Sequence, residues 1–264
     1  MLKDISSVVN RCYRRFVTTS PFRGVPPRPL VVHCGYHKAG TTWFNNVLRA
    51  VSAHFGLKYE LCEPEDRSES TEIYLCNDSK IDLKTLPAYI GTHMIRDPRD
   101  LIVSGYFYHQ HTKEHWAHVP RTEYGGRTYQ GYLCSLDQRE GVMAEIRRTS
   151  PNILRMVDWD YANPAFLEIK YEDMMAEEEC YWRKVFGHYG FCEAGLDKAV
   201  DIAKSFTLSK VKGKSVVGAM NEKHIRSGES QQWVDVFTDD HKAYFHELVG
   251  DALVTLGYEK SNDW

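Results

Sequence analysis

The sequence lacks any apolar run close to the ~20 residues that a membrane-spanning helix needs. Its N-terminus, MLKDISSVVNRCYRRF, is too polar for a secretory signal and is typical of a short amphipathic helix that packs on the body of the protein. A large net charge is absent too, because 33 Lys and Arg face 36 Asp and Glu. We therefore expect no stable membrane insertion and no general affinity for nucleic acid, so any anion site must be a local cluster.

Paired cysteines are also missing. The seven cysteines form an odd set without a CxxC pair, which is typical of reduced thiols and predicts a cytoplasmic protein. Four histidines gather in YHQHTKEHWAHVP, but their spacing matches no closed zinc site, so we expect no metal. With 264 residues, 42% of them hydrophobic, the chain is long enough for one well-packed domain.

Buried strands alternate with helical patterns along the chain. A strand over residues 30–34 precedes the helical run TTWFNNVLRAVSAHFG, which Gly56 ends. Ala88 to Ile95 forms a second strand, after which Asp97 can cap a helix that has Pro98 in its first turn. AFLEIKY is a third strand, and LKYELC and EIYLC are shorter candidates. This alternation predicts a single α/β domain over residues 1–264, with a parallel sheet flanked by helices and sites at the carboxyl ends of its strands.

Further helices are predicted in the second half of the chain. They are EGVMAEIRRTSPNILRMV, a run over residues 177–189, and a closing helix in DDHKAYFHELVGDALVTLGY that Gly257 stops. Residues 1–27 are expected to form an N-terminal helical extension. The glycine-containing polar stretch at 207–237 predicts a mobile segment that covers the cofactor.

The stretch GYHKAGTTW resembles a phosphate-binding loop with a displaced lysine. In GxxxxGK[ST] the lysine follows the second glycine, whereas here Thr41 takes that place and Lys38 lies three residues earlier. A turn between strand and helix directs backbone N–H groups and the positive helix end at one spot. The pattern predicts a P-loop-like anion site whose lysine reaches an oxygen close to the first phosphorus.

Two more basic elements can contribute to this site. RDPRDLIVS places Arg96 just after the second strand and Ser104 two helical turns later, although Arg99 and Asp100 are also consistent with a solvated surface cluster. HIRSGESQQW adds Arg226 and the backbone amide of Gly228. Because both strand ends lie at one edge of the sheet, a ligand with two separated phosphates can bridge them.

YHKAGTTW, RDPRDLIVS, IKYEDM and IRSGESQQW resemble, in order and spacing, the sulfotransferases that use 3′-phosphoadenosine 5′-phosphosulfate (PAPS), in particular the cytosolic type. The resemblance covers residues 30–238. It implies a sulfonyl transfer from PAPS to a hydroxyl or amine of a small molecule, with adenosine 3′,5′-bisphosphate (PAP) as product and no metal. It also implies three groups of cofactor contacts: the loop His37, Lys38, Ala39, Gly40, Thr41 and Thr42 at the phosphosulfate; Trp43, Tyr171, Ser205 and Phe206 at the nucleoside; and Arg96, Ser104, Arg226, Ser227 and Gly228 at the 3′-phosphate.

The catalytic base departs from the family pattern. Cytosolic members carry a KTH motif whose histidine deprotonates the acceptor, and this sequence has EIYLCNDSK there instead. Asp78 is one candidate, Glu63 a second because other branches use a glutamate, and His109 or His111 a third. We expect His93 to be a buried structural residue. Lys38 is the candidate for stabilising the leaving phosphate.

Other departures limit the resemblance. RKG becomes RSG, which predicts weaker binding of the 3′-phosphate, and GDW becomes QQW. The dimer motif KxxxTVxxxE is absent, since Val234, Asp239 and Ala243 occupy its key positions, so we expect no dimer of that type. Aromatic residues near Tyr106 hint at a ring-bearing acceptor. Two alternatives stay open: a degenerate protein that binds PAPS or PAP without turnover, and an atypical P-loop kinase that uses Mg-ATP.

Overall fold

A five-stranded parallel sheet forms the centre of the molecule. The computed structural model describes residues 20–23, 28–207 and 230–264. The strands are β1 (Leu30–Gly35), β2 (Tyr59–Leu61), β3 (Ile73–Asn77), β4 (Tyr89–Ile95) and β5 (Phe166–Lys170), in the order β2-β3-β1-β4-β5. All four pairings are parallel, so the carboxyl ends of the strands share one edge.

The chain changes direction around β1. It leaves β1 toward β2, returns through β3 and then crosses to β4 on the other side of β1. Crevices at such switch points, outside the carboxyl ends of the strands, are the usual ligand sites of open α/β sheets. β1 is buried along its whole length, as expected for a central strand.

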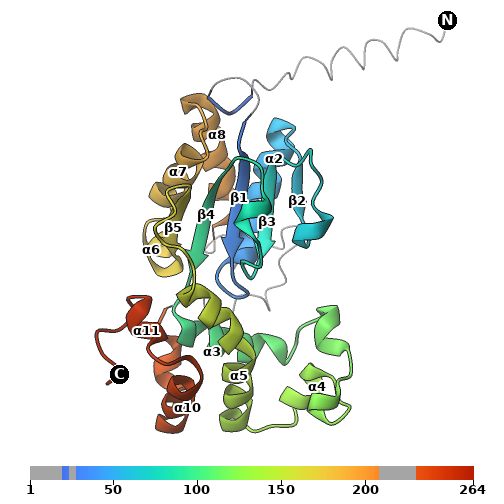
Figure 1. Cartoon of the computed structure of the whole chain (residues 1–264), viewed down its shortest axis with the longest axis vertical. Coiled ribbons are helices and arrows are strands. Elements are labelled where there is room, and N and C mark those ends of the chain that lie inside the picture. Colours follow the sequence, from blue (N-terminus) through green and yellow to red (C-terminus); the bar gives the residue numbers. More distant parts are fainter. Residues whose placement is uncertain (1–19, 24–27, 208–229) are drawn as a thin grey trace, which may run out of the picture.

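Helices cover one face of the sheet and also form a layer below it (Figure 1). α2 (Thr41–Phe55), α7 (Glu178–His188) and α8 (Glu193–Ala203) pack on the face that carries Val31, Leu75 and Met94. A second apolar cluster joins α3 (Pro98–His109), α4 (Tyr129–Leu133), α5 (Gln138–Val157), α10 (Asp239–Val249) and α11 (Ala252–Thr255). In Figure 1 this layer lies at the carboxyl edge of the sheet, below β1 and β4. Short α6 (Tyr171–Ala176) follows β5 directly.

The strand-helix alternation predicted from the sequence is confirmed. Gly56 ends α2 in a left-handed conformation, and Asp97 caps α3 by accepting a hydrogen bond from the backbone N–H of Arg99, with Pro98 in the first turn. The single closing helix was wrong, because Gly250 breaks it into α10 and α11 with φ 55° and ψ −129°. These backbone angles are open to glycine and costly for other residues.

Two predicted segments lie largely outside the described residues. Of the extension at 1–27, the structure describes only residues 20–23, where Phe22 forms an isolated antiparallel β-bridge with Phe191. Of the cofactor-covering segment at 207–237, it describes only residue 207 and residues 230–237, which include a 3₁₀ turn at Gln232–Asp235. Their proposed roles stay predictions. Among the described helices, none is long and apolar enough to cross a membrane.

Candidate active site

The loop between β1 and α2 is a tight, hydrogen-bonded turn. The carbonyl of Tyr36 accepts two hydrogen bonds, from the backbone N–H of Ala39 at 2.9 Å and from Oγ1 of Thr41 at 2.8 Å. Lys38 and Gly40 both adopt left-handed backbone angles, with φ 70° and 84°. For a lysine this conformation costs about 1–2 kcal/mol, a strain typical of functional loops.

Gly40 lets the turn approach its neighbours closely. A Cβ atom on Gly40 would lie 3.2 Å from both Sδ of Met94 on β4 and the ring of Tyr171 on α6. The first turn of α2 therefore sits against the ends of β4 and β5. The N-terminus of this 15-residue helix, with no acidic residue in its first turn, faces the same edge.

Lys38 and Arg96 bring positive charge to this edge. Arg96 is buried, and its Nη1 donates to the carbonyl oxygen of Lys38 at 3.1 Å, while its guanidinium lies 4.5 Å from the ring centre of Tyr171. Nζ of Lys38 lies 3.7 Å from the ring centre of Tyr108 on α3. Burial, and secondly the charge of Arg96, lower the pKa of Lys38 to about 8. The cation therefore gains from any anion that reaches it.

The RDPRD segment is buried, and its interpretation as a solvated surface cluster was wrong. Arg99 donates to both carboxylate oxygens of Asp97 and lies under the ring of Trp233. Asp100 is fully buried and accepts hydrogen bonds from the backbone N–H groups of Gln231 at 2.8 Å and Trp233 at 3.2 Å. Burial raises the pKa of Asp100. The segment thus ties the chain just after residue 229 to the start of α3, beside Arg96.

The remaining predicted cofactor residues have mixed placements. Thr42 and Ser205 are exposed, and Ser104 is partly buried on the same helix as Tyr108. Phe206 is partly buried and packs against the apolar cluster that contains α2. Trp43 is only 2% exposed, with its ring edge-on to Trp182 at 5.4 Å, so the face expected to stack on adenine is covered in this conformation. Arg226, Ser227 and Gly228 lie outside the described residues.

Two of the proposed bases have different surroundings. Oδ1 of Asp78 accepts hydrogen bonds from the backbone N–H of His37 and from Nδ2 of Asn152, both at 3.0 Å. Asp78 therefore holds the loop that carries Lys38 in position through a hydrogen bond. Glu63 is exposed just after β2, at the outer side of the sheet. Both assignments as bases stay predictions.

The third proposed base, His109, belongs to a chain of three side chains. Its Nε2 lies 3.0 Å from Nε2 of His37, and its Nδ1 lies 3.0 Å from Oε2 of Glu145 on α5. His109 and Glu145 are 0% and 1% exposed, whereas His37 is partly buried on the loop next to Lys38. Burial alone would raise the pKa of Glu145, but His109 and Arg148 beside it lower the value to about 2.

Comparison with known proteins decides the family. A family model described as the sulfotransferase domain matches residues 91–257, more than half of the chain. The chain belongs to the sulfotransferase family. Because the match begins after the loop at residues 35–43, that loop supports the assignment independently. A search among curated proteins returned no match for this sulfotransferase.

Solved structures of known sulfotransferases and related proteins were compared with this chain. The mouse sulfotransferase SULT7A1, described in complex with PAP, is 16% identical, with 87% of this chain and 84% of that chain covered and a TM-score of 0.51. Retinol dehydratase in a complex with retinol and PAP is 16% identical, with 86% and 82% covered and a TM-score of 0.48. At 16% identity the likeness to SULT7A1 concerns the fold of this sulfotransferase alone.

Glu145 and Asp100 were missed by the sequence analysis of this sulfotransferase. A signal for Glu145 was present, because it shares the buried face of α5 with Val142 and Ile146. A carboxylate on an apolar helix face requires a partner. Asp100 gave no such signal, since its partners come from residues 231 and 233. His93 is buried and its Nδ1 lies 2.6 Å from Oε2 of Glu168, as a structural histidine requires. Within the described residues no three His, Cys, Asp or Glu side chains form a metal-binding group.

Proposed function

We propose that this sulfotransferase moves a sulfonyl group from PAPS to a hydroxyl or amine of a small molecule. The contact between Arg96 and Lys38 carries the proposal, because it joins the ends of β1 and β4 through two positively charged residues. A nucleotide with separate 5′- and 3′-phosphates suits two such centres. The tight turn at Gly40, with the helix N-terminus behind it, fits the first of the two phosphates.

Each residue near the loop has a distinct task in this proposal. PAPS supplies the sulfonyl group and a phosphate that takes up negative charge as the group leaves. Lys38 stabilises that charge, and one donor of this kind in a site shielded from water contributes about 3 kcal/mol, about a hundredfold in rate. Arg96 and Ser104 bind the 3′-phosphate. Tyr171, whose ring already packs on Arg96, orients the nucleoside.

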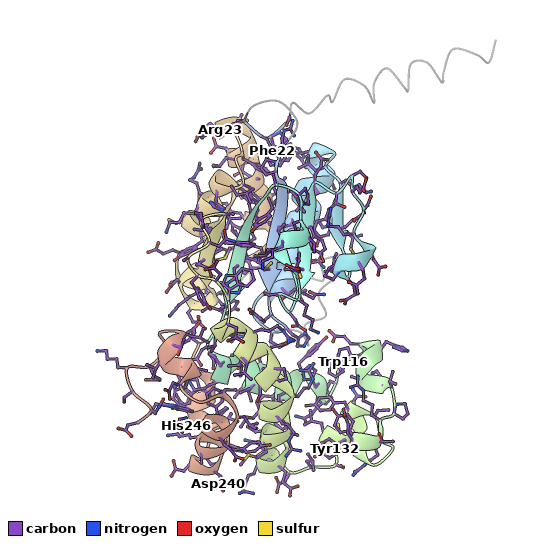
Figure 2. The ribbon with its side chains drawn as sticks, viewed as in Figure 1. Phe22, Arg23, Trp116, Tyr132, Asp240 and His246 are labelled. Atoms are coloured by element: carbon purple, nitrogen blue, oxygen red, sulfur yellow. The ribbon has the colours of Figure 1, made fainter. Side chains whose placement is uncertain are left out.

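The acceptor is expected beside His37. Tyr108 lies 5.6 Å from the ring of His37, and Trp116 lies 5.1 Å from His109 (centre to centre), so aromatic side chains flank this end of the loop. Figure 2 shows Trp116 and Tyr132 on the segment beside α5, at the same side of the molecule. These contacts favour a ring-bearing acceptor. The six free cysteines among the described residues support a reducing, cytoplasmic setting.

Calorimetric titration with PAP, AMP and Mg-ATP tests the cofactor. We expect PAP to bind more tightly than AMP, because the 3′-phosphate engages Arg96. Lys38→Ala should weaken PAP binding about tenfold or more, since a charge-assisted hydrogen bond is worth about 1.5–3 kcal/mol. Lys184→Ala is the matched control: Lys184 is exposed on the outer side of α7, away from the loop, and its Nζ likewise lies over an aromatic ring, 4.3 Å from that of Tyr181.

The alternatives predict different results. Preference for Mg-ATP over PAP would favour a kinase and contradict the proposal. PAP binding without sulfonyl transfer to any acceptor tried would favour a degenerate nucleotide-binding protein. An equal loss of affinity in Lys38→Ala and Lys184→Ala would show that the loop lysine has no special role.

A further inference from the structure

The chain His37–His109–Glu145 begins at the loop and ends inside the helical layer. His37 lies directly before Lys38, His109 is at the C-terminal end of α3, and Glu145 is in the middle of α5. Glu145 also accepts a hydrogen bond from the hydroxyl of Tyr129 at 2.6 Å and pairs with Arg148 at 3.3 Å. A buried carboxylate with this many partners is held in one position.

Close packing of α3 against α5 makes the contact possible. A Cβ on Gly105 would lie 2.5 Å from Oε1 of Glu145, so a larger residue on α3 would displace the carboxylate. Gly105 lies one helical turn before His109, on the same side of α3. Glycine at position 105 is therefore what lets Glu145 reach the imidazole.

The proton positions follow from the ionisation of Glu145. As a carboxylate, Glu145 only accepts, so Nδ1 of His109 carries the proton between them. In neutral His109 the other nitrogen, Nε2, is then an acceptor, and Nε2 of His37 must donate to it. Nδ1 of His37 is then the unprotonated nitrogen of the neutral ring, which is partly buried next to Lys38.

We propose that His37 is the general base of the transfer, with His109 and Glu145 as positioning residues that receive its second proton. This inference rests on the proposed function. The acceptor O–H bond breaks and its proton moves to Nδ1 of His37, while the Nε2 proton of His37 passes to Nε2 of His109. The oxygen's electron pair forms the new S–O bond, and the old S–O bond breaks with its pair on the departing phosphate.

This transfer of protons from the acceptor through His37 to His109, called the relay below, keeps positive charge away from the loop. A histidine acting alone would become an imidazolium next to Lys38, within a cluster that already contains Arg96. Passing one proton on leaves His37 neutral and places the charge on His109, beside the carboxylate of Glu145. Coulomb attraction then stabilises the charged state instead of opposing it.

Proton–nitrogen correlation spectra of labelled histidine test the proton positions directly. We expect the proton on Nε2 of His37 and on Nδ1 of His109 near neutral pH, with resonances assigned from the spectra of His37→Gln and His109→Gln. In Glu145→Gln, His109 should lose its fixed preference for carrying the proton on Nδ1. A proton on Nδ1 of His37 in the wild-type protein would contradict the relay.

Binding and turnover separate this inference from the proposed function. Glu145→Gln should bind PAP with an affinity within about twofold of wild type, because Glu145 reaches the loop only through the rings of His109 and His37. Its turnover should fall by about a hundredfold, a loss typical of removed acid–base assistance. Sulfonyl transfer from PAPS to a panel of phenols and alcohols, followed as formation of PAP, is the assay. His93→Gln is the control, since His93 also joins a carboxylate and a further side chain but ends at Tyr36.

Each outcome has one meaning. If the wild-type protein fails to bind PAP, the proposed function fails, whatever the histidine spectra show. If PAP binds but His37→Gln and Glu145→Gln keep their turnover, or the histidine protons lie on the opposite nitrogens, only the relay fails. Equal losses of turnover in His93→Gln and Glu145→Gln would assign the effect to packing.

Discussion

At the scale of single residues, Lys38 combines a strained backbone with a buried charge. Its backbone is left-handed, its carbonyl accepts from Arg96, and its ammonium lies on Tyr108. None of these three contacts is with a carboxylate, and the nearby charges of Glu114 and Glu145 raise the pKa of Lys38 by less than burial and Arg96 lower it. Its pKa of about 8 reflects burial first and Arg96 second. A phosphate ligand would add negative charge directly beside the ammonium.

Binding of PAP should therefore depend on pH. Below about pH 8 Lys38 is protonated and binds the anion; above that value the proton must be taken up on binding, so affinity falls, at most tenfold for each pH unit. Calorimetry from about pH 7 to about pH 9.5, in buffers of different ionisation enthalpy, measures both the affinity and the proton uptake. Lys38→Arg should remove this dependence, because arginine stays charged. An affinity that rises with pH would contradict the assignment.

The residues of the loop could be predicted from the sequence, whereas their partners could not. GYHKAGTTW is contiguous, so its glycines and Lys38 are visible as a pattern. Glu145, Asn152 and Asp100 act through contacts across 36, 74 and 131 or more positions. Such pairings depend on how α3 and α5 pack. For the same reason the sequence did not reveal the hydrogen bond that the carboxylate of Asp78 accepts from the backbone N–H of His37.

At the scale of elements, the strands and most helices followed from local patterns. β4 and its capped helix α3 were visible because buried apolar runs, Asp97 and Pro98 act within a few residues. The break at Gly250 was missed, since a glycine inside an amphipathic pattern is compatible with a continuous helix. Helix α5 runs through Pro151, so a local helix breaker did not end it. Packing against α3 and α10 outweighs that local cost.

The start of α2 offers a test of how elements meet at the site. Gly40→Ala introduces a Cβ at φ 84° and presses it against Met94 and Tyr171. We expect a loss of about 1–3 kcal/mol in the free energy of unfolding and weaker PAP binding. Gly125→Ala is the matched control, because φ is 63° there and no atom lies within 4 Å of the added Cβ. Denaturant unfolding and PAP titration of both variants give the comparison.

Comparison of the two variants separates the cost of backbone strain from the effect of the close approach at Gly40. Gly125→Ala should cost about 1 kcal/mol through backbone strain and leave PAP binding unchanged. If Gly40→Ala costs no more than Gly125→Ala and binds PAP like wild type, the close approach of α2 to Tyr171 has no bearing on the site.

At the scale of the whole molecule, Arg99 joins segments far apart in the sequence. It pairs with Asp97 at the start of α3 and with Glu259 near the C-terminal end, at 2.7 Å and 2.5 Å. Its guanidinium lies 3.8 Å from the ring centre of Trp233 and 4.8 Å from that of Trp264. The chain after residue 230 is therefore held to α3, which begins two positions after Arg96.

Arg99→Lys should loosen this junction and lower global stability. Lysine keeps the charge but cannot bond both carboxylates as a planar fork or stack between two indole rings, so we expect a loss of about 3 kcal/mol, as for a disrupted buried ion pair. Arg183→Lys is the control, because Arg183 also pairs with two carboxylates, Asp197 and Glu193, but is exposed; its loss should stay within about 1 kcal/mol. Denaturant unfolding followed by far-ultraviolet circular dichroism and by tryptophan fluorescence measures both. Equal losses in the two variants would contradict a special role for Arg99. Separate transitions by the two probes in wild type would mean that the C-terminal helices unfold independently of the sheet.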